Sequence, residues 1–198
     1  GVLNDVFAQF RHSVSEAEQS DMADWLYVSL RRMEESFFLA PDSLEIEEDL
    51  FSERKIAEAV FDRIRGKYPV QPTGAELDYF ALYIRGRRNF TPSTPIPEEI
   101  QKTVADFLEF FRRESDIDLT HDAVFQEGLA LHCIPMWVRI KYDMQIGSRM
   151  ADNVRKSFPF GYDVATYFGS FLREKYGKEL LDSELALLAV HMHQALRS

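Results

Sequence analysis

Two of the five histidines end apolar runs, and this placement favours a shared site. His132 follows Leu129-Ala-Leu, and His191 follows Leu187-Leu-Ala-Val. A single histidine on an apolar helix face is commonly a hydrogen-bonded core residue. Two of them, ending the same kind of run in two helices of one bundle, favour a common function. Arg139 lies two turns after His132 on the same helix face, where its guanidinium could reach an anion beside the imidazole. The alternative for Arg139 is a solvated charge or an ion pair.

Pro135 lies within the helix that is predicted to carry His132. Its ring displaces the carbonyl of residue 131 and removes one helical hydrogen bond, which bends a helix. The bend either opens one face beside His132 to solvent or only curves the helix around the core.

The other histidines do not suggest a metal site. His191 and His193 are two residues apart, so on a helix they point roughly 200° away from each other. His121-Asp122 is similar to the dipeptide of HD-type metal phosphohydrolases, which are also helical. Here it stands at a predicted helix start, where aspartate is a favoured capping residue. No further ligands can be assigned, so this enzyme is only a minor alternative.

The usual catalytic motifs do not stand out in the sequence. We find no glycine-rich phosphate loop, nucleophile elbow or paired-carboxylate arrangement. We therefore expect no enzyme activity, no cofactor and no metal.

The elements that must position these histidines are helices in two halves, separated by a proline-rich linker at residues 89–97. Apolar spacing of three and four predicts the helices of both halves. They span 22–38, 54–68 and 73–87 in the first half, and 98–114, 122–142, 147–158, 162–176 and 182 to the end in the second. Residues 42–53 hold six acids and are expected to form a solvated loop or an exposed helix.

The two halves are repeats. Residues 55–86 align without a gap on residues 163–194, which places Glu76 on Glu184 and Tyr83 on His191. A weaker register, offset by 107, places Trp25 on His132. The fold class predicted is all-α, with two tandem five-helix-type bundles at residues 1–92 and 93–198. The first bundle lacks both histidines and the second keeps both.

Composition excludes several classes of protein. The 198 residues carry a net charge of −10, which disfavours binding of this segment to nucleic acid because such domains present a basic face. The one cysteine, Cys133, fits a reducing cytoplasm. No apolar stretch is long enough for a membrane span, and no signal peptide is recognised.

Three segments of the second half resemble the motifs of PTS regulation domains (PRD), the helical modules of bacterial transcription regulators controlled by the sugar phosphotransferase system. They are Leu129-x-x-His132-Cys-x-Pro135-x-x-x-Arg139, Lys156-Ser-Phe-Pro159 and Glu184 followed at seven residues by His191. The whole chain resembles a tandem pair of these domains. The first copy departs from the pattern at both histidine positions.

The resemblance implies that His132 and His191 are phosphorylated by the phosphocarrier HPr or an enzyme II component, with Arg139 near the phosphate. It also implies a cytoplasmic homodimer that reaches DNA or RNA through a domain outside this chain and has no membrane partner. Pro135, and a first copy whose acidic segment lacks an Asn-Pro dipeptide, look more like the activator branch than the antiterminators. The alternative from another class is a structural helical dimerisation or interaction module with core histidines.

Overall fold

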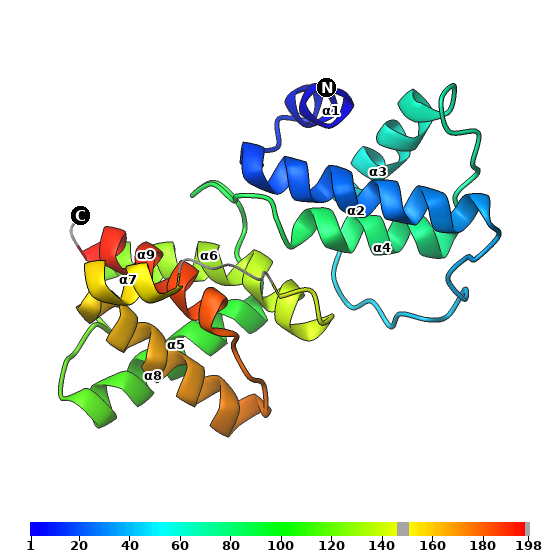
Figure 1. Cartoon of the computed structure of the whole chain (residues 1–198). Helices are drawn as coiled ribbons and strands as arrows, with labels where there is room; N and C mark the ends of the chain where they lie inside the picture. Colours follow the sequence, from blue (N-terminus) through cyan, green and yellow to red (C-terminus); the bar gives the residue numbers. More distant parts are fainter. Residues whose placement is uncertain (146–150, 197–198) are drawn as a thin grey trace. The chain divides into compact units, whose positions relative to one another are not determined.

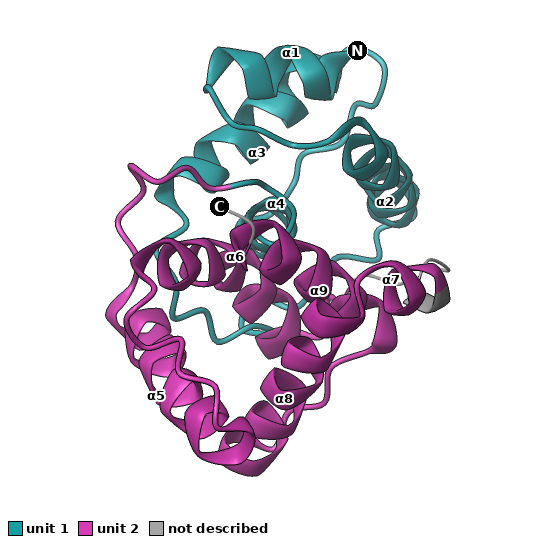
Figure 2. Cartoon of the chain, turned by 90° about the vertical axis from the view of Figure 1, so that its left-hand side faces the viewer, with its two compact units in different colours: residues 1–89 teal, residues 90–198 magenta. Residues whose placement is uncertain are grey.

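The computed structural model describes residues 1–145 and 151–196, and its regular elements within these ranges are all helices (Figure 1). The chain divides into two compact units, residues 1–89 and residues 90–198 (Figure 2). The boundary falls at the start of the predicted linker. Among the described residues, no helix is both long and apolar enough to span a membrane.

Residues 1–89, all of which the structure describes, form four helices: α1 (Val2–Gln9), α2 (Glu16–Glu34), α3 (Phe51–Ile64) and α4 (Gly74–Arg85). Helix α1 packs on α2 and α3, and α4 packs on both α2 and α3. Their apolar faces enclose one core. Its fully buried members include Val6, Met22, Ile56, Phe80 and Ile84.

The second unit contains α5 (Glu98–Ser115), α6 (Ala123–Lys141), α7 (Ala151–Ser157), α8 (Pro159–Tyr176) and α9 (Asp182–Leu196). Its core is rich in aromatic rings, and the Phe107 ring meets the Phe168 ring edge to face at 4.7 Å between centroids. Helix α9 packs against α6, α7 and α8, so it lies at the centre of this bundle. The predicted helix at 147–158 begins outside the described residues, and its described part is α7.

Helix ends follow local capping chemistry. Ser15, Thr73 and Asp122 each accept a hydrogen bond from the backbone N–H three residues later, which satisfies a donor at the start of α2, α4 and α6. Gly177 ends α8 with a φ of 63°, the left-handed conformation that glycine adopts without strain. Because Ser15 caps α2, this helix starts six residues before the predicted residue 22.

The helices of the two units repeat at the predicted spacing. Helices α8 and α9 start 108 residues after α3 and α4, and α6 starts 107 residues after α2. The first unit differs from the expected five helices, because residues 35–50 between α2 and α3 form no helix. Pro41 and closely spaced acids in this segment oppose helix formation, since like charges one turn apart repel. The acidic segment is a loop up to Leu50, and α3 starts at Phe51.

Candidate histidine site

Helices α6 and α9 bring His132 and His191 together. The centroids of the two imidazole rings are 4.1 Å apart, and the ring planes are inclined by 39°. The two residues are 59 positions apart in the chain, and they meet because α6 and α9 pack side by side. The structure therefore joins the two histidines that the sequence singled out.

The two rings differ in their access to solvent. His132 is buried, with 8% of its surface exposed, and its Nε2 atom has no hydrogen-bond partner. His191 is exposed at the surface of the unit. The pair therefore consists of one exposed residue and one buried residue.

The pKa values of both imidazoles are lowered, which favours the neutral form at neutral pH. Burial lowers the pKa of His132 well below its usual value, and the nearby His191 and Arg139 lower it further. The pKa of His191 is also lowered, because its ring loses hydration against the protein and feels the charge of Arg139. A neutral imidazole keeps a ring nitrogen with a free electron pair at neutral pH.

Arg139 is paired with Glu184. Its Nε and Nη2 atoms donate to the two carboxylate oxygens of Glu184, each at 2.8 Å, and both side chains are buried. Arg139 lies seven residues after His132, and Glu184 lies seven residues before His191. The helices α6 and α9 are therefore antiparallel here, with the ion pair about 10 Å along the axis from the histidines.

The first unit repeats the ion pair of the second unit, but it has other aromatic rings at the positions of the histidines. Trp25 and Tyr83, at the positions of the histidines, stack with 4.5 Å between centroids. Arg32 donates to both carboxylate oxygens of Glu76 at 2.6 and 2.7 Å, as Arg139 does to Glu184. The sequence interpretation did not assign Glu184 as the partner of Arg139. The repeat could have indicated this pair, because the 107 register aligns Arg32 with Arg139 and the 108 register aligns Glu76 with Glu184.

Other residues singled out in the sequence lie apart from the histidine pair. The side chain of His121 is 92% exposed, and the Asp122 carboxylate caps α6. The His193 ring lies against Phe158, at 4.5 Å between centroids, rather than beside His191. Within the described residues, no group of three or more His, Cys, Asp or Glu side chains has the arrangement of a metal site.

Three further residues, Cys133, Pro135 and Gly161, affect the packing of α6, α8 and α9. Cys133 is buried, and burial raises the pKa of its thiol to about 12. Helix α6 continues through Pro135, which supplies no N–H to the carbonyl of Leu131. On the other side, a Cβ on Gly161 would lie 2.5 Å from the carbonyl oxygen of Ala189, so glycine allows α8 to approach α9 closely.

Comparison with known proteins finds a family similarity over the segment that holds this site. Residues 105–195 match the family model of the PRD domain, and this range includes both histidines, Arg139 and Glu184. The chain is 25% identical over 150 residues to a Bacillus subtilis (strain 168) protein named "Probable licABCH operon regulator". This match covers 73% of the chain and 23% of the relative's length. No solved structure matches the chain. The second unit is thus similar to PRD domains over residues 105–195, the segment that holds the histidine pair.

Proposed function

We propose that the second unit is a regulatory module controlled by phosphorylation of His132 and His191. The observation that carries this proposal is the contact between the imidazoles of His132 and of the exposed His191 at the junction of α6 and α9. In the resembling family the phosphoryl donor is HPr or an enzyme II component of the sugar phosphotransferase system. The exposed His191 offers such a donor protein direct access.

Neutral histidine is the form that accepts a phosphoryl group. The free electron pair of a ring nitrogen forms the new P–N bond, and the P–N or P–S bond to the donor side chain breaks as that side chain takes back its electron pair. Protonated imidazole has no such pair, so the lowered pKa values of His132 and His191 favour the reaction. We infer that His191 reacts first, because His132 is buried behind it.

A phosphate at this position changes the charge balance between α6 and α9. It adds about −1.5 to −2 charges and several acceptor oxygens. Arg139 lies two turns of α6 from His132, and it is bound to Glu184 in the unphosphorylated protein. The phosphate either attracts Arg139 or repels neighbouring acids. Both effects bias the packing of the two helices, and we infer that this change is transmitted to a homodimer interface.

For the whole protein, we propose a cytoplasmic transcription regulator that binds DNA or RNA through a domain outside this chain. The PRD domain and the name of the B. subtilis relative support this assignment. The acidic charge of −10 agrees with a control module rather than a nucleic-acid-binding one. Among regulators, we favour the activator type, because of Pro135 and an acidic first copy without an Asn-Pro dipeptide.

The alternative hypothesis is a structural module with core histidines. It predicts two buried imidazoles that are hydrogen-bonded to the backbone, with no nearby cation. The exposure of His191, the unpartnered Nε2 of His132 and the proximity of Arg139 support the phosphorylation proposal instead.

Incubation with enzyme I, HPr and labelled phosphoenolpyruvate tests the proposal. We expect an acid-labile label on the wild-type chain, less label on His191→Ala and none on the His132→Ala/His191→Ala double variant. The control variant, His121→Ala/His193→Ala, removes two histidines outside the pair and should keep the label. The proposal fails if a correctly folded wild-type chain takes no label from HPr or from an enzyme II component, or if the double variant is labelled equally.

A further inference from the structure

The contact between His132 and His191 allows a reaction within the chain as well as one with a donor protein. The two ring centroids are 4.1 Å apart, and the rings come from different helices, α6 and α9. A phosphoryl group attached to one imidazole is therefore a near neighbour of the other. In well-oriented cases, such proximity is equivalent to a free reactant at about 10⁵–10⁸ M.

The two histidines differ in how a donor protein reaches them. His191 is an exposed residue, whereas 8% of the surface of His132 is exposed. The Nε2 atom of His132 is buried and has no hydrogen-bond partner among the described residues. A donor protein must bring its phosphorus atom to within about 3–3.5 Å of the acceptor nitrogen. The buried Nε2 atom does not allow this approach while α6 and α9 stay packed.

We propose that His132 receives its phosphoryl group from His191, by direct transfer between the two imidazoles. This inference rests on the function proposed above and gives the two histidines different roles, with His191 as the first acceptor and His132 as the internal acceptor. The free electron pair of the His132 Nε2 atom forms the new P–N bond. The P–N bond to His191 breaks, and its electron pair returns to the His191 ring. Each ring keeps the proton on its other nitrogen, so the step needs no further reactant.

Ring rotation aligns the two nitrogens for this step. The ring planes are inclined by 39°, and the electron pair of a ring nitrogen lies in the plane of its ring. In-line transfer therefore requires at least one imidazole to turn about its Cβ–Cγ bond. That torsion has broad preferred ranges in histidine, and the turn breaks no hydrogen bond at the Nε2 atom of His132.

The transfer links phosphorylation to the packing of α6 and α9. It moves a charge of about −1.5 to −2 from an exposed residue to a buried one. A buried charge is costly unless it is solvated or paired, and the guanidinium of Arg139 is already bound to Glu184. The charge on His132 therefore favours separation of the two helices. The same cost limits the transfer, so we expect label on both histidines at equilibrium.

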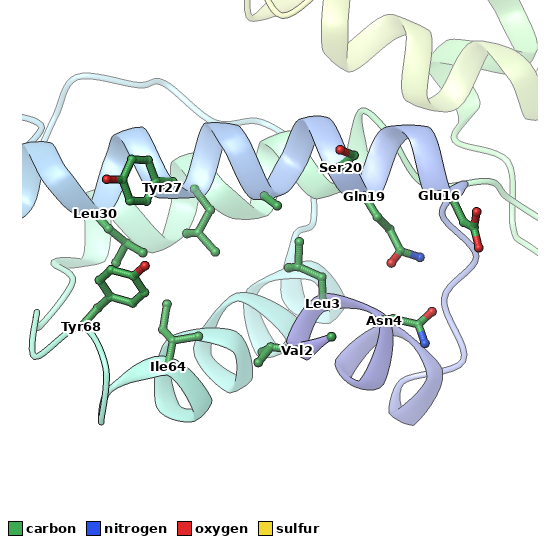
Figure 3. Close-up of a pocket in the computed structure, with 13 residues that line it drawn as sticks. Val2, Leu3, Asn4, Glu16, Gln19, Ser20, Tyr27, Leu30, Ile64 and Tyr68 are labelled. Atoms are coloured by element: carbon green, nitrogen blue, oxygen red, sulfur yellow. The ribbon is translucent and has the colours of Figure 1, made fainter.

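The first unit lacks the groups for this transfer. Trp25 and Tyr83 occupy the equivalent positions and stack at 4.5 Å between centroids, but neither ring has a basic nitrogen. Residues 1–89 contain one histidine, His12, so no imidazole pair can form within them. A groove of about 460 Å³ lies between α2 and α1 with the end of α3, and its lining includes no histidine (Figure 3).

A time course after removal of the donor tests the proposal on the whole chain. The chain is labelled briefly by a limiting amount of phosphorylated HPr or of an enzyme II component, and the labelled histidine is located by mass spectrometry at alkaline pH. We expect label on His191 first. Label on His132 should then rise as label on His191 falls, at a rate that does not depend on protein concentration. Label that stays on His191 alone would overturn the proposal.

Two phenylalanine variants separate the roles of the two rings. His191→Phe keeps an aromatic ring at this position but removes the first acceptor, so label on His132 should fall about tenfold or more. In His132→Phe, the label should stay on His191. His193→Phe is the matched control, because the His193 ring lies against Phe158, and it should behave as the wild type.

A mixing experiment distinguishes transfer within one chain from transfer between chains. His132→Phe, labelled on His191, is mixed with unlabelled His191→Phe and should pass little label to its His132. Labelling of His132 at the wild-type rate in the His191→Phe chain, from the donor or after mixing, would overturn the transfer and leave phosphorylation itself intact. A folded wild-type chain that takes no label would instead overturn the function proposed above, and the transfer with it.

Discussion

Arg139 and Glu184 form a buried two-point ion pair, and each stands seven residues from one member of the histidine pair. Arg32 and Glu76 form the equivalent pair beside Trp25 and Tyr83. The ion pair is therefore common to both units, whereas the pair of rings two helical turns away differs. We infer that the ion pair sets the register of the two helices and thereby places the rings against each other.

Arg139→Met should strongly destabilise the second unit. The substitution leaves the fully buried carboxylate of Glu184 without its main cation, which costs about 3–5 kcal/mol. Urea unfolding followed by Trp137 fluorescence in a Trp25→Phe background measures this loss. Arg32→Met is the matched control in the first unit. Because the Arg32 side chain is 28% exposed, its loss should be smaller.

The second unit should lose stability as the pH falls from about 7 to 5. The pKa values of His132 and His191 are lower in the folded than in the unfolded protein, so below pH 6.5 the unfolded chain binds more protons. Each histidine contributes a slope of up to about 1.4 kcal/mol per pH unit in this window. Above pH 7 their contribution is constant.

Denaturant unfolding at several pH values checks this dependence, with the His132→Phe/His191→Phe variant as reference. In the His132→Phe/His191→Phe variant, the unfolding free energy should change less between pH 7 and 5. It should still fall below pH 5, where the carboxylates become protonated. An identical slope in both proteins would show that the histidines are not the titrating groups.

Many of the helices were predictable because they follow local rules. Thr73 with Glu76, Gly177 and the three-and-four spacing of Val104, Phe107 and Phe111 mark helices in the sequence alone. Helix α1 was not predicted, since an isolated helix of eight residues is unstable and this one depends on packing against α3. The unequal exposure of His132 and His191 was also not predictable, because the apolar runs before them are alike and tertiary packing decides which ring is covered.

Gly161→Ala should destabilise the contact between α8 and α9. The new methyl group would lie 2.5 Å from the Ala189 carbonyl oxygen, which is backbone and yields only if a helix shifts. We expect a loss of about 1–3 kcal/mol in the unfolding free energy of the second unit. Gly128→Ala is the control, because its methyl group would meet only Ala195 Cβ at 3.6 Å and should be neutral or slightly stabilising.

The two units should be separable, and only the second should accept phosphate. Each has its own core, so residues 1–89 and 90–198, expressed separately, should each unfold cooperatively. The second fragment contains His132 and His191, and it should take the same acid-labile label as the whole chain. Label on the first fragment, where Trp25 and Tyr83 occupy the equivalent positions, would contradict the assignment of the histidine pair.

Cys133 provides a probe for opening of α6. Its thiol is buried and has a pKa of about 12, so the unmodified protein should react with a maleimide at pH 8 only as fast as the unit opens. A phosphate on buried His132 does not fit between α6 and α9 unless these helices move apart, which exposes the neighbouring Cys133. We therefore expect phosphorylation to accelerate maleimide labelling in the wild type but not in His132→Ala. Equal labelling rates before and after phosphorylation of His132 would mean that α6 and α9 stay packed.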